Sequence, residues 1–359
     1  MEQIKKCYIL GDGMKKIFVM LYARANLGDD LFLQILLERY SNVQFYINID
    51  KEFSHIVKNH KNVTIVEKQP ETFENRKPEE YDGYIYIGGS IFMEGGTVYN
   101  IDSHAEKFME KCKEKNIPFF YISSNFGPYK TEEYVNLARR IYSNCNEICF
   151  RDRYSYELFK DIETVTYAPD AIFTYNIEQT EKQKNTIGIS VIDLSIREDL
   201  KYLEKEYYKT LSSNICNYVD NGYEIALISF CKYEGDEKAI SKLKKHIPKH
   251  YLDKVHVIKY NGNIQKFIDK YKRIEYMICS RFHAMILSAI CKQKMFVMSY
   301  SKKIDNVIKD LEFSIKTLDL HELKENTLIN LEQFKKTQNI DYIRQASQGQ
   351  FKKLDEYFA

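Results

Sequence analysis

The chain has 359 residues, of which 44% are hydrophobic and 29% are charged, an ordinary balance for a soluble globular protein. Its 53 basic and 51 acidic residues leave a net charge of +2 and are spread along the chain. This balance excludes the basic surface on which nucleic-acid binding depends, so any anionic ligand must be held by a local site. At roughly 100–200 residues per domain, the length predicts two domains.

The eight cysteines indicate neither a disulfide framework nor a metal site. No two of them are separated by two residues, and Cys145 and Cys149 have no histidine at the spacing of zinc ligands. Four cysteines lie within or at the ends of short apolar runs, namely Cys7, Cys149, Cys231 and Cys279. We therefore expect buried, reduced thiols in a cytosolic protein that needs no metal or cofactor.

The sequence contains no candidate membrane span, because no stretch approaches the ~20 apolar residues that a spanning helix needs. Residues 17–23 follow two lysines and resemble the start of a signal peptide, but this apolar run is short and ends at Arg24. A first core strand fits these residues better than a signal peptide does. We expect a cytoplasmic protein.

In the first half of the chain, short apolar runs alternate with longer amphipathic segments. The runs are residues 17–23, 44–49, 62–66, 84–87, 119–123 and 147–151, and the amphipathic segments between them include 29–40, 103–116 and 132–144. Apolar runs of this length, separated by helices, predict a parallel β-sheet with helices on both faces.

The pattern stops at the polar residues 176–185, which we interpret as a linker, and then starts again. The predicted strands of the second half are residues 186–191, 224–230, 255–258, 276–279 and 295–299, and the predicted helices are 202–221, 237–246, 264–273 and 282–291. We therefore expect two α/β domains, residues 1–178 and 179–359. Residues 322–359 are predicted to form a helical tail that either caps the second domain or crosses back to the first.

Ligands of such sheets bind where the strands end, so the residues after each strand are the candidates for a site. The first strand leads to Asn26, Gly28 and Asp29, just before a helix. A glycine there lets an anion approach free backbone N–H groups at the positive end of the helix dipole. The alternative is a structural turn in which Asp29 caps the helix.

Two further strand ends carry small or polar residues. Gly88 and Gly89 follow the strand 84–87, and paired glycines permit close approach of a ligand or of the other domain, although a flexible loop has the same composition. Asn125 lies in the turn after the strand 119–123. That turn exposes donors that could contact an acceptor hydroxyl, or it is only a turn.

Basic residues follow two other strands. Arg151 ends the strand 147–151 and could bind a carboxylate or phosphate in a bidentate manner, or pair with a structural acid such as Asp152. Ser280 is predicted to cap the helix 282–291, which places Arg281 and His283 in its first turn. Basic residues oppose the helix dipole at that end, so this pair suggests a bound anion.

The neighbours of these two strand ends complete the candidate set. Phe282 stands between Arg281 and His283, and Tyr300 and Lys303 follow the next strand. Lys303 could contact the same anion, or belong to a solvated charged turn.

Taken in order, these segments resemble the polysaccharide pyruvyl transferase family. The resemblance rests on residues 26–30, 88–89, 124–128, 151–153 with Ser155, 169–171, 280–283, and Tyr300 with Lys303, and it covers most of residues 15–315. It implies two Rossmann-like domains in a GT-B-like arrangement around an interdomain cleft. It also implies that phosphoenolpyruvate donates a pyruvate group to a sugar and forms a ketal.

The resemblance implies roles for individual residues. Arg151, Arg281 and His283 stand at the positions of the family's catalytic arginines and histidine, and Asp170 is a candidate base at the domain junction. The implied acceptor is a cell-surface polysaccharide, such as an exopolysaccharide or capsule, or its lipid-linked precursor. The reaction would then take place at the cytoplasmic face of the membrane, with peripheral association of the protein.

The chain also departs from the family pattern. Residues 22–25 replace a more glycine-rich opening, and residues 192–194 stand where we expect a basic residue. We do not assign Arg197 to that role. These differences concern the choice of acceptor more than the donor pocket.

Three alternatives stay open from the sequence. The first is a GT-B glycosyltransferase that uses a nucleotide sugar, but such enzymes commonly carry a glutamate in the helix corresponding to 282–291, which here contains no acidic residue. The second is a transferase or ligase with another small phosphorylated donor, and the third is a binding module without catalysis. The acceptor sugar and the oligomeric state are also open.

Overall fold

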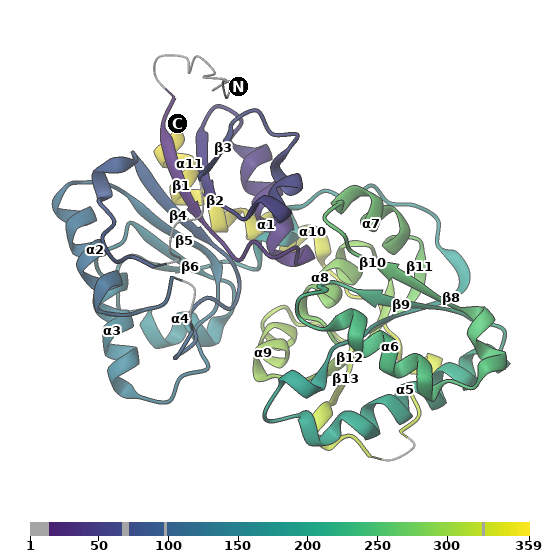
Figure 1. Ribbon diagram of the computed structural model, residues 1–359. Helices are drawn as coiled ribbons and strands as arrows, with labels where there is room; N and C mark the ends of the chain where they lie inside the picture. The colour runs from purple at the N-terminus through teal and green to yellow at the C-terminus, as the bar shows by residue number, and fades with distance from the viewer. Residues whose placement is uncertain (1–13, 67–71, 97–98, 325–326) are drawn as a thin grey trace, which may run out of the picture.

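The computed structural model describes residues 14–66, 72–96, 99–324 and 327–359. They form two α/β domains, each built on a parallel sheet, in the GT-B-like arrangement (Figure 1). The two-domain α/β fold expected from the sequence is thereby confirmed. Cys7 lies outside the described residues. The seven described cysteines are unpaired, and all except Cys216 are buried.

The first domain contains a seven-stranded parallel sheet with the strand order β3-β2-β1-β4-β5-β6-β7. Its strands are β1 (Lys16–Met20), β2 (Gln44–Asn48), β3 (Val63–Val66), β4 (Gly83–Ile87), β5 (Phe119–Ser124), β6 (Glu147–Phe150) and β7 (Val165–Tyr167). Its helices are α1 (Leu27–Arg39), α2 (Ser103–Glu114), α3 (Glu132–Tyr142) and α4 (Arg153–Phe159). Each helix begins after a capping side chain that accepts a backbone N–H, namely Asn26, Asp102, Thr131 and Asp152.

The second domain contains a six-stranded parallel sheet with the strand order β10-β9-β8-β11-β12-β13. Its strands are β8 (Gln183–Ser190), β9 (Glu224–Ser229), β10 (Val255–Lys259), β11 (Ile274–Cys279), β12 (Lys294–Ser299) and β13 (Lys316–Asp319). Its helices are α5 (Glu204–Asp220), α6 (Asp236–His246), α7 (Ile264–Tyr271), α8 (Phe282–Ile290) and α9 (Lys302–Asp310).

The structure corrects the predicted elements in two ways. Strand β8 begins at Gln183, so the last three residues of the predicted linker 176–185 belong to the sheet. Their polar side chains are exposed, which hid the strand from a search for apolar runs. The sequence also left α4, β7, α9 and β13 unassigned. These elements are short and lie beside the outer strands or at the sheet edges, where the apolar pattern is weak.

The apolar core is continuous between the domains. It extends from Leu31 and Phe32 of α1 through Ile172 and Phe173 to Met285 of α8. A separate, aromatic-rich core fills the other face of the first sheet, beneath α2 and α3. The domains are therefore joined by buried side chains as well as by the chain itself, which stabilises one relative placement of the two sheets.

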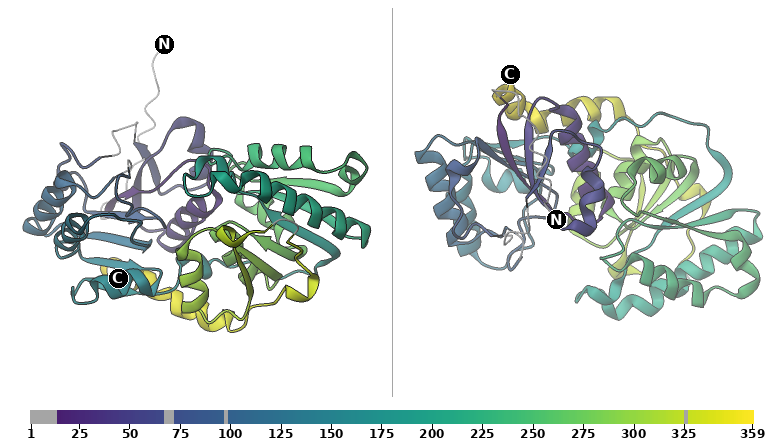
Figure 2. Two further views of the ribbon diagram at one scale, coloured as in Figure 1. Left: turned by 90° about the horizontal axis from the view of Figure 1, so that it is seen from below. Right: turned by 45° about the horizontal axis from the view of Figure 1, so that its top comes forward.

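The C-terminal helices cross back to the first domain, which is one of the two arrangements left open by the sequence. They are α10 (Ile340–Ser347), η9 (Gln348–Phe351) and α11 (Lys352–Phe358). In the right-hand view of Figure 2 these yellow helices lie over the purple strands. Arg39 forms an ion pair with Asp355 at 2.6 Å, and the Tyr357 hydroxyl donates to the Asp82 carbonyl at 2.8 Å.

Gln350 ties this returning segment to the ends of three strands. Its Oε1 accepts the Ser123 N–H at 2.8 Å, and its Nε2 donates to the carbonyls of Phe150 and Ala168 at 3.3 and 2.6 Å. These three residues lie one or two positions before the site residues Asn125, Arg151 and Asp170. Gln350 thus connects the chain terminus to the geometry of the site.

Replacing Gln350 with alanine is expected to lower the free energy of unfolding by ~2–4 kcal/mol, because buried donors and acceptors lose their partners. Urea unfolding followed by circular dichroism measures this change. Gln345→Ala, at an exposed position of α10, is the matched control and should change stability little. Equal stability of the two variants would contradict the role given to Gln350.

Candidate active site

The carboxyl ends of the two sheets face each other, and the residues that follow them meet between the domains. From the first domain come Asn26, Gly28, Asp29, Gly88, Gly89, Asn125, Arg151 and Asp170, and from the second come Ser280, Arg281, Phe282, His283, Tyr300 and Lys303. Contacts across the cleft join Arg151 to His283 and Ser90 to Lys303. The sequence-derived candidates therefore converge on one interdomain site.

Arg151 is buried at the centre of this site. Its Nη1 donates to Asp170 Oδ2 and its Nη2 to Asn125 Oδ1, both at 2.8 Å. Its Cζ lies 4.1 Å from the centre of the Phe282 ring in the other domain. A Cβ on Gly89 would stand 2.4 Å from Nη2, so only glycine leaves room for this guanidinium. Arg151 is thus held by groups from both domains.

Gly88 and Asn125 keep the loops of the first domain in register around this arginine. The Gly88 N–H donates to the Ile122 carbonyl at 3.2 Å, and the Asn125 N–H donates to the Gly89 carbonyl at 2.8 Å. Strand end β4 is therefore bonded to the loop after β5.

His283 packs against the first turn of α1 in the opposite domain. A Cβ on Gly28 would lie 1.6 Å from His283 Nδ1, and the Phe32 ring meets the imidazole edge-on at 5.5 Å. Arg151 Nη1 lies 3.4 Å from Nε2, and because a guanidinium can only donate, Nε2 is the nitrogen without a proton. Burial lowers the pKa of His283 well below its usual range, and the charges of Arg151, Lys303 and Arg281 lower it further. The imidazole is therefore neutral at physiological pH.

Asp170 is enclosed in the ion pair with Arg151. Its second oxygen accepts the Ile172 N–H at 2.8 Å, and its Oδ2 lies 4.0 Å from His283 Nε2. Burial raises its pKa, while the charge of Arg151 opposes that rise. This geometry holds Arg151 in place and leaves Asp170 little access to a ligand.

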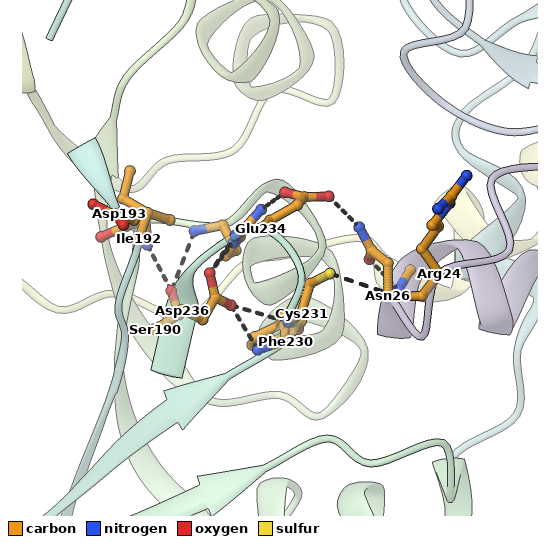
Figure 3. Close-up of polar contacts among 12 residues, drawn as sticks. Arg24, Asn26, Ser190, Ile192, Asp193, Phe230, Cys231, Glu234 and Asp236 are labelled. Atoms are coloured by element: carbon orange, nitrogen blue, oxygen red, sulfur yellow. Dashed lines mark hydrogen bonds and ion pairs between the residues drawn. The ribbon is translucent and has the colours of Figure 1, made fainter. Parts of the chain in front are cut away.

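Arg281 faces two carboxylates of its own domain. Its Nε donates to Asp236 Oδ1 at 3.1 Å, and its Nη atoms contact Asp236 and Glu234. Glu234 also accepts a hydrogen bond from the Asn26 amide at 2.7 Å, which bridges the domains (Figure 3). The second oxygen of Asp236 accepts the backbone N–H groups after β9, from Phe230 and Cys231. Arg281 therefore organises this bridge.

Ser280 does not cap α8, contrary to the prediction, because the N-cap position belongs to Arg281. Ser190, at the end of β8, accepts the N–H of Ser280 at 2.7 Å and that of Arg281 at 3.2 Å. A serine from the neighbouring strand thus replaces the predicted cap. Ser280 is fully buried beneath the cleft, where its hydroxyl lies 3.4 Å from that of Tyr207.

Three candidates have fewer partners in the protein. Lys303 donates to Ser90 Oγ at 3.0 Å, and Tyr300 lies beside it in the cleft. Burial raises the pKa of Asp29 well above its usual range, and the negative charges of Glu234 and Asp30 raise it further. Arg151 and Lys303 oppose this rise only in part. These surroundings favour the protonated form of the Asp29 carboxyl group.

Sequence reasoning missed Glu234, Asp236 and Ser190. A signal for the first two was present, because the segment after β9 contains a carboxylate on each side of Gly235 directly before a helix. The rule that directed attention to other strand ends applies equally to this one. Ser190 carried no such signal, since a serine inside a strand gives no sign of what it bonds.

A match to a family model shows to which family the chain belongs. The family model described as polysaccharide pyruvyl transferase matches residues 26–302, more than half of the chain. The chain belongs to the polysaccharide pyruvyl transferase family. The matched segment begins at Asn26 and includes every candidate residue named above except Lys303.

The chain is also similar to the amylovoran biosynthesis protein AmsJ of Erwinia amylovora. It is 22% identical over 276 residues, which are 70% of this chain and 65% of AmsJ. The match thus spans slightly less than two thirds of that relative.

Solved structures with similar folds include HepE of Anabaena in complex with UDP and glucose. HepE has a TM-score of 0.57 and 12% identity, with 96% of this chain and 99% of HepE covered. The UDP-GlcNAc 2-epimerase of Methanocaldococcus jannaschii has a TM-score of 0.56 and 12% identity, with coverages of 95% and 99%. This pyruvyl transferase family member therefore shares their fold.

None of the helices in the described residues is both long and apolar enough to cross a membrane. Within the same ranges, no three or more His, Cys, Asp or Glu side chains gather where they could hold a metal ion.

The neutral state of His283 gives a direct prediction. In ¹⁵N NMR spectra its imidazole should stay unprotonated at about pH 6, where an ordinary histidine is mostly protonated. Below about pH 6.5 the unfolded chain binds this proton and the folded protein does not, so His283 should lower stability as the pH falls. His283→Asn assigns the signal by removing it. A His283 signal that titrates near pH 6.5 would contradict the described environment.

Proposed function

We propose that this protein transfers the pyruvyl group of phosphoenolpyruvate to a sugar of a cell-surface polysaccharide, or of its lipid-linked precursor, and forms a pyruvate ketal. Family membership supports a transferase of polysaccharide biosynthesis. One observation carries the finer proposal: Asp29, a carboxyl group whose pKa is raised by burial, lies close enough to Arg151 and Lys303 for their charges to act on it. An enolpyruvyl donor needs an acid for its carbon and cations for its charged groups.

The start of α8 offers further donors for a small anion. Ser190 occupies the N–H groups of Ser280 and Arg281, but those of Phe282 and His283 have no acceptor among the described residues. Free N–H groups at the first turn of a helix, together with its dipole, favour a phosphate or carboxylate. Lys303 from α9 adds a positive charge to the same cleft.

We propose that Asp29 donates the proton to C3 of phosphoenolpyruvate and accepts the proton of the first sugar hydroxyl. A carboxyl group with a raised pKa is an effective acid at neutral pH. His283 is neutral and accepts a hydrogen bond from Arg151, and Asp170 lies inside its ion pair. The sequence suggested acid–base roles for His283 and Asp170. We propose instead that these two residues position Arg151 and the first turn of α1.

In the proposed reaction, Asp29 donates one proton and later recovers one. Asp29 gives its proton to C3 of phosphoenolpyruvate, and the first sugar hydroxyl attacks C2 while its proton passes to the Asp29 carboxylate. The bond between C2 and the phosphate oxygen then breaks, and the second hydroxyl attacks C2 and closes the ring. Its proton leaves with the phosphate, so Asp29 ends in its starting state.

We also propose an acceptor and a place for the reaction. A relative named for amylovoran biosynthesis supports an extracellular polysaccharide as the acceptor class. We propose that the reaction takes place at the cytoplasmic face of the membrane, where a lipid-linked precursor would meet a peripherally associated protein.

Replacing Asp29 with asparagine is expected to reduce turnover about 100-fold or more while the affinity for phosphoenolpyruvate stays within about threefold. Phosphate release with a panel of p-nitrophenyl glycosides measures turnover, and calorimetry measures affinity. In the wild type, turnover should fall as the pH rises through the raised pKa of Asp29, because the acid is then lost. Asp161→Asn, at an exposed ion pair, is the control. Full turnover by Asp29→Asn would exclude Asp29 as the acid.

A second candidate function is glycosyl transfer from a nucleotide sugar, which the fold shared with the UDP complex of HepE favours. Against it, α8 contains no acidic residue that could hold a ribose. Calorimetry with UDP-glucose distinguishes the two. Binding of UDP-glucose without binding of phosphoenolpyruvate would replace the proposed donor.

A further inference from the structure

Arg197 is a further cation of the interdomain site, and it has no role in the reaction steps given above. It lies between η4 (Leu194–Ile196) and η5 (Lys201–Leu203), in the segment that follows β8. Its Cζ lies 4.2 Å from the centre of the Tyr300 ring, and Lys303 Nζ lies 5.8 Å from the same point. One tyrosine ring thus holds two positive groups close together.

Unlike Arg151 and Arg281, Arg197 and Lys303 form no ion pair with a carboxylate of the described residues, although the charge of Glu234 acts on both. Arg151 is paired with Asp170, and Arg281 contacts both Glu234 and Asp236. In the described part of the chain, neither Arg197 nor Lys303 forms such an ion pair, and Arg197 Nε is buried without a hydrogen-bond partner. A buried guanidinium N–H without an acceptor costs free energy, which indicates that a ligand supplies the acceptor.

We propose that Arg197, Tyr300 and Lys303 form an anion subsite that binds the phosphate group of the donor. The phosphate is the part of phosphoenolpyruvate whose negative charge increases when its bond to C2 breaks, so unpaired cations there stabilise the leaving group. The identity of the donor rests on the proposed function, whereas the subsite itself rests on the unpaired cations.

The geometry suits a phosphate. Arginine presents Nε and Nη in one plane, a fork that matches two oxygens of a phosphate, and the Nε of Arg197 is free. Stacking on Tyr300 fixes the plane of that fork. Lys303 adds a point charge from the first turn of α9. The sequence suggested both Arg151 and Arg281 as ligands of the anion, but Arg281 is already engaged by two carboxylates.

The test compares Arg197→Gln with Arg153→Gln by calorimetry, using phosphoenolpyruvate, inorganic phosphate and UDP as separate probes. Arg153 is a matched control, because its Cζ also lies over a tyrosine ring, 4.8 Å from the centre of Tyr167. We expect Arg197→Gln to weaken phosphoenolpyruvate binding about tenfold or more and Arg153→Gln to leave it unchanged. Arg197→Lys, which keeps the charge and loses the fork, should lie between, and unfolding curves verify that each variant folds.

The possible outcomes test the subsite and the identity of the donor separately. Unchanged affinity in both Arg197 variants would overturn the subsite. Binding of phosphate or UDP, but not of phosphoenolpyruvate, with the loss confined to the Arg197 variants, would support the subsite and refute the proposed donor. A wild-type protein that binds none of the three probes would overturn both.

Discussion

The site depends on the burial of one guanidinium between two domains. Removing the charge of Arg151 from water is costly unless every donor finds a partner, and the partners come from both sides of the cleft. Asp170 and Asn125 supply acceptors from the first domain, and Phe282 and His283 supply a ring and a nitrogen from the second. The arrangement therefore forms only when the two sheets are placed as described.

The same placement determines the protonation states that the proposed chemistry needs. The cations around His283 and its burial keep the imidazole neutral, while burial and nearby carboxylates raise the pKa of Asp29. A second contact across the domains, from the Tyr260 hydroxyl to Asp30 in α1, accompanies a pKa of Asp30 raised to about 7 by burial. The packing of the two domains thus gives the site an acid and a set of hydrogen-bond donors for an anion.

Much of this could be predicted from the sequence, because alternating apolar runs and helices define parallel sheets, and strand ends define where a site lies. The candidates from Asn26 to Lys303 indeed meet in one cleft. Their partners could not be predicted, since pairing between distant residues leaves no local pattern. Arg281 illustrates this: its position in the sequence suggests an anion ligand, and only the fold brings Glu234 and Asp236 against it. Arg197, which the sequence set aside, stacks on Tyr300 for the same reason.

The most direct measurement is a crystal structure of Asp29→Asn with phosphoenolpyruvate, since this variant should bind the donor without turning it over. We expect the ligand to lie between the first turn of α1 and Lys303, with Arg151 still in contact with Phe282 and His283. A ligand bound elsewhere, or a site in which Arg151 contacts only its own domain, would contradict the proposal that the interdomain site binds a small phosphorylated donor.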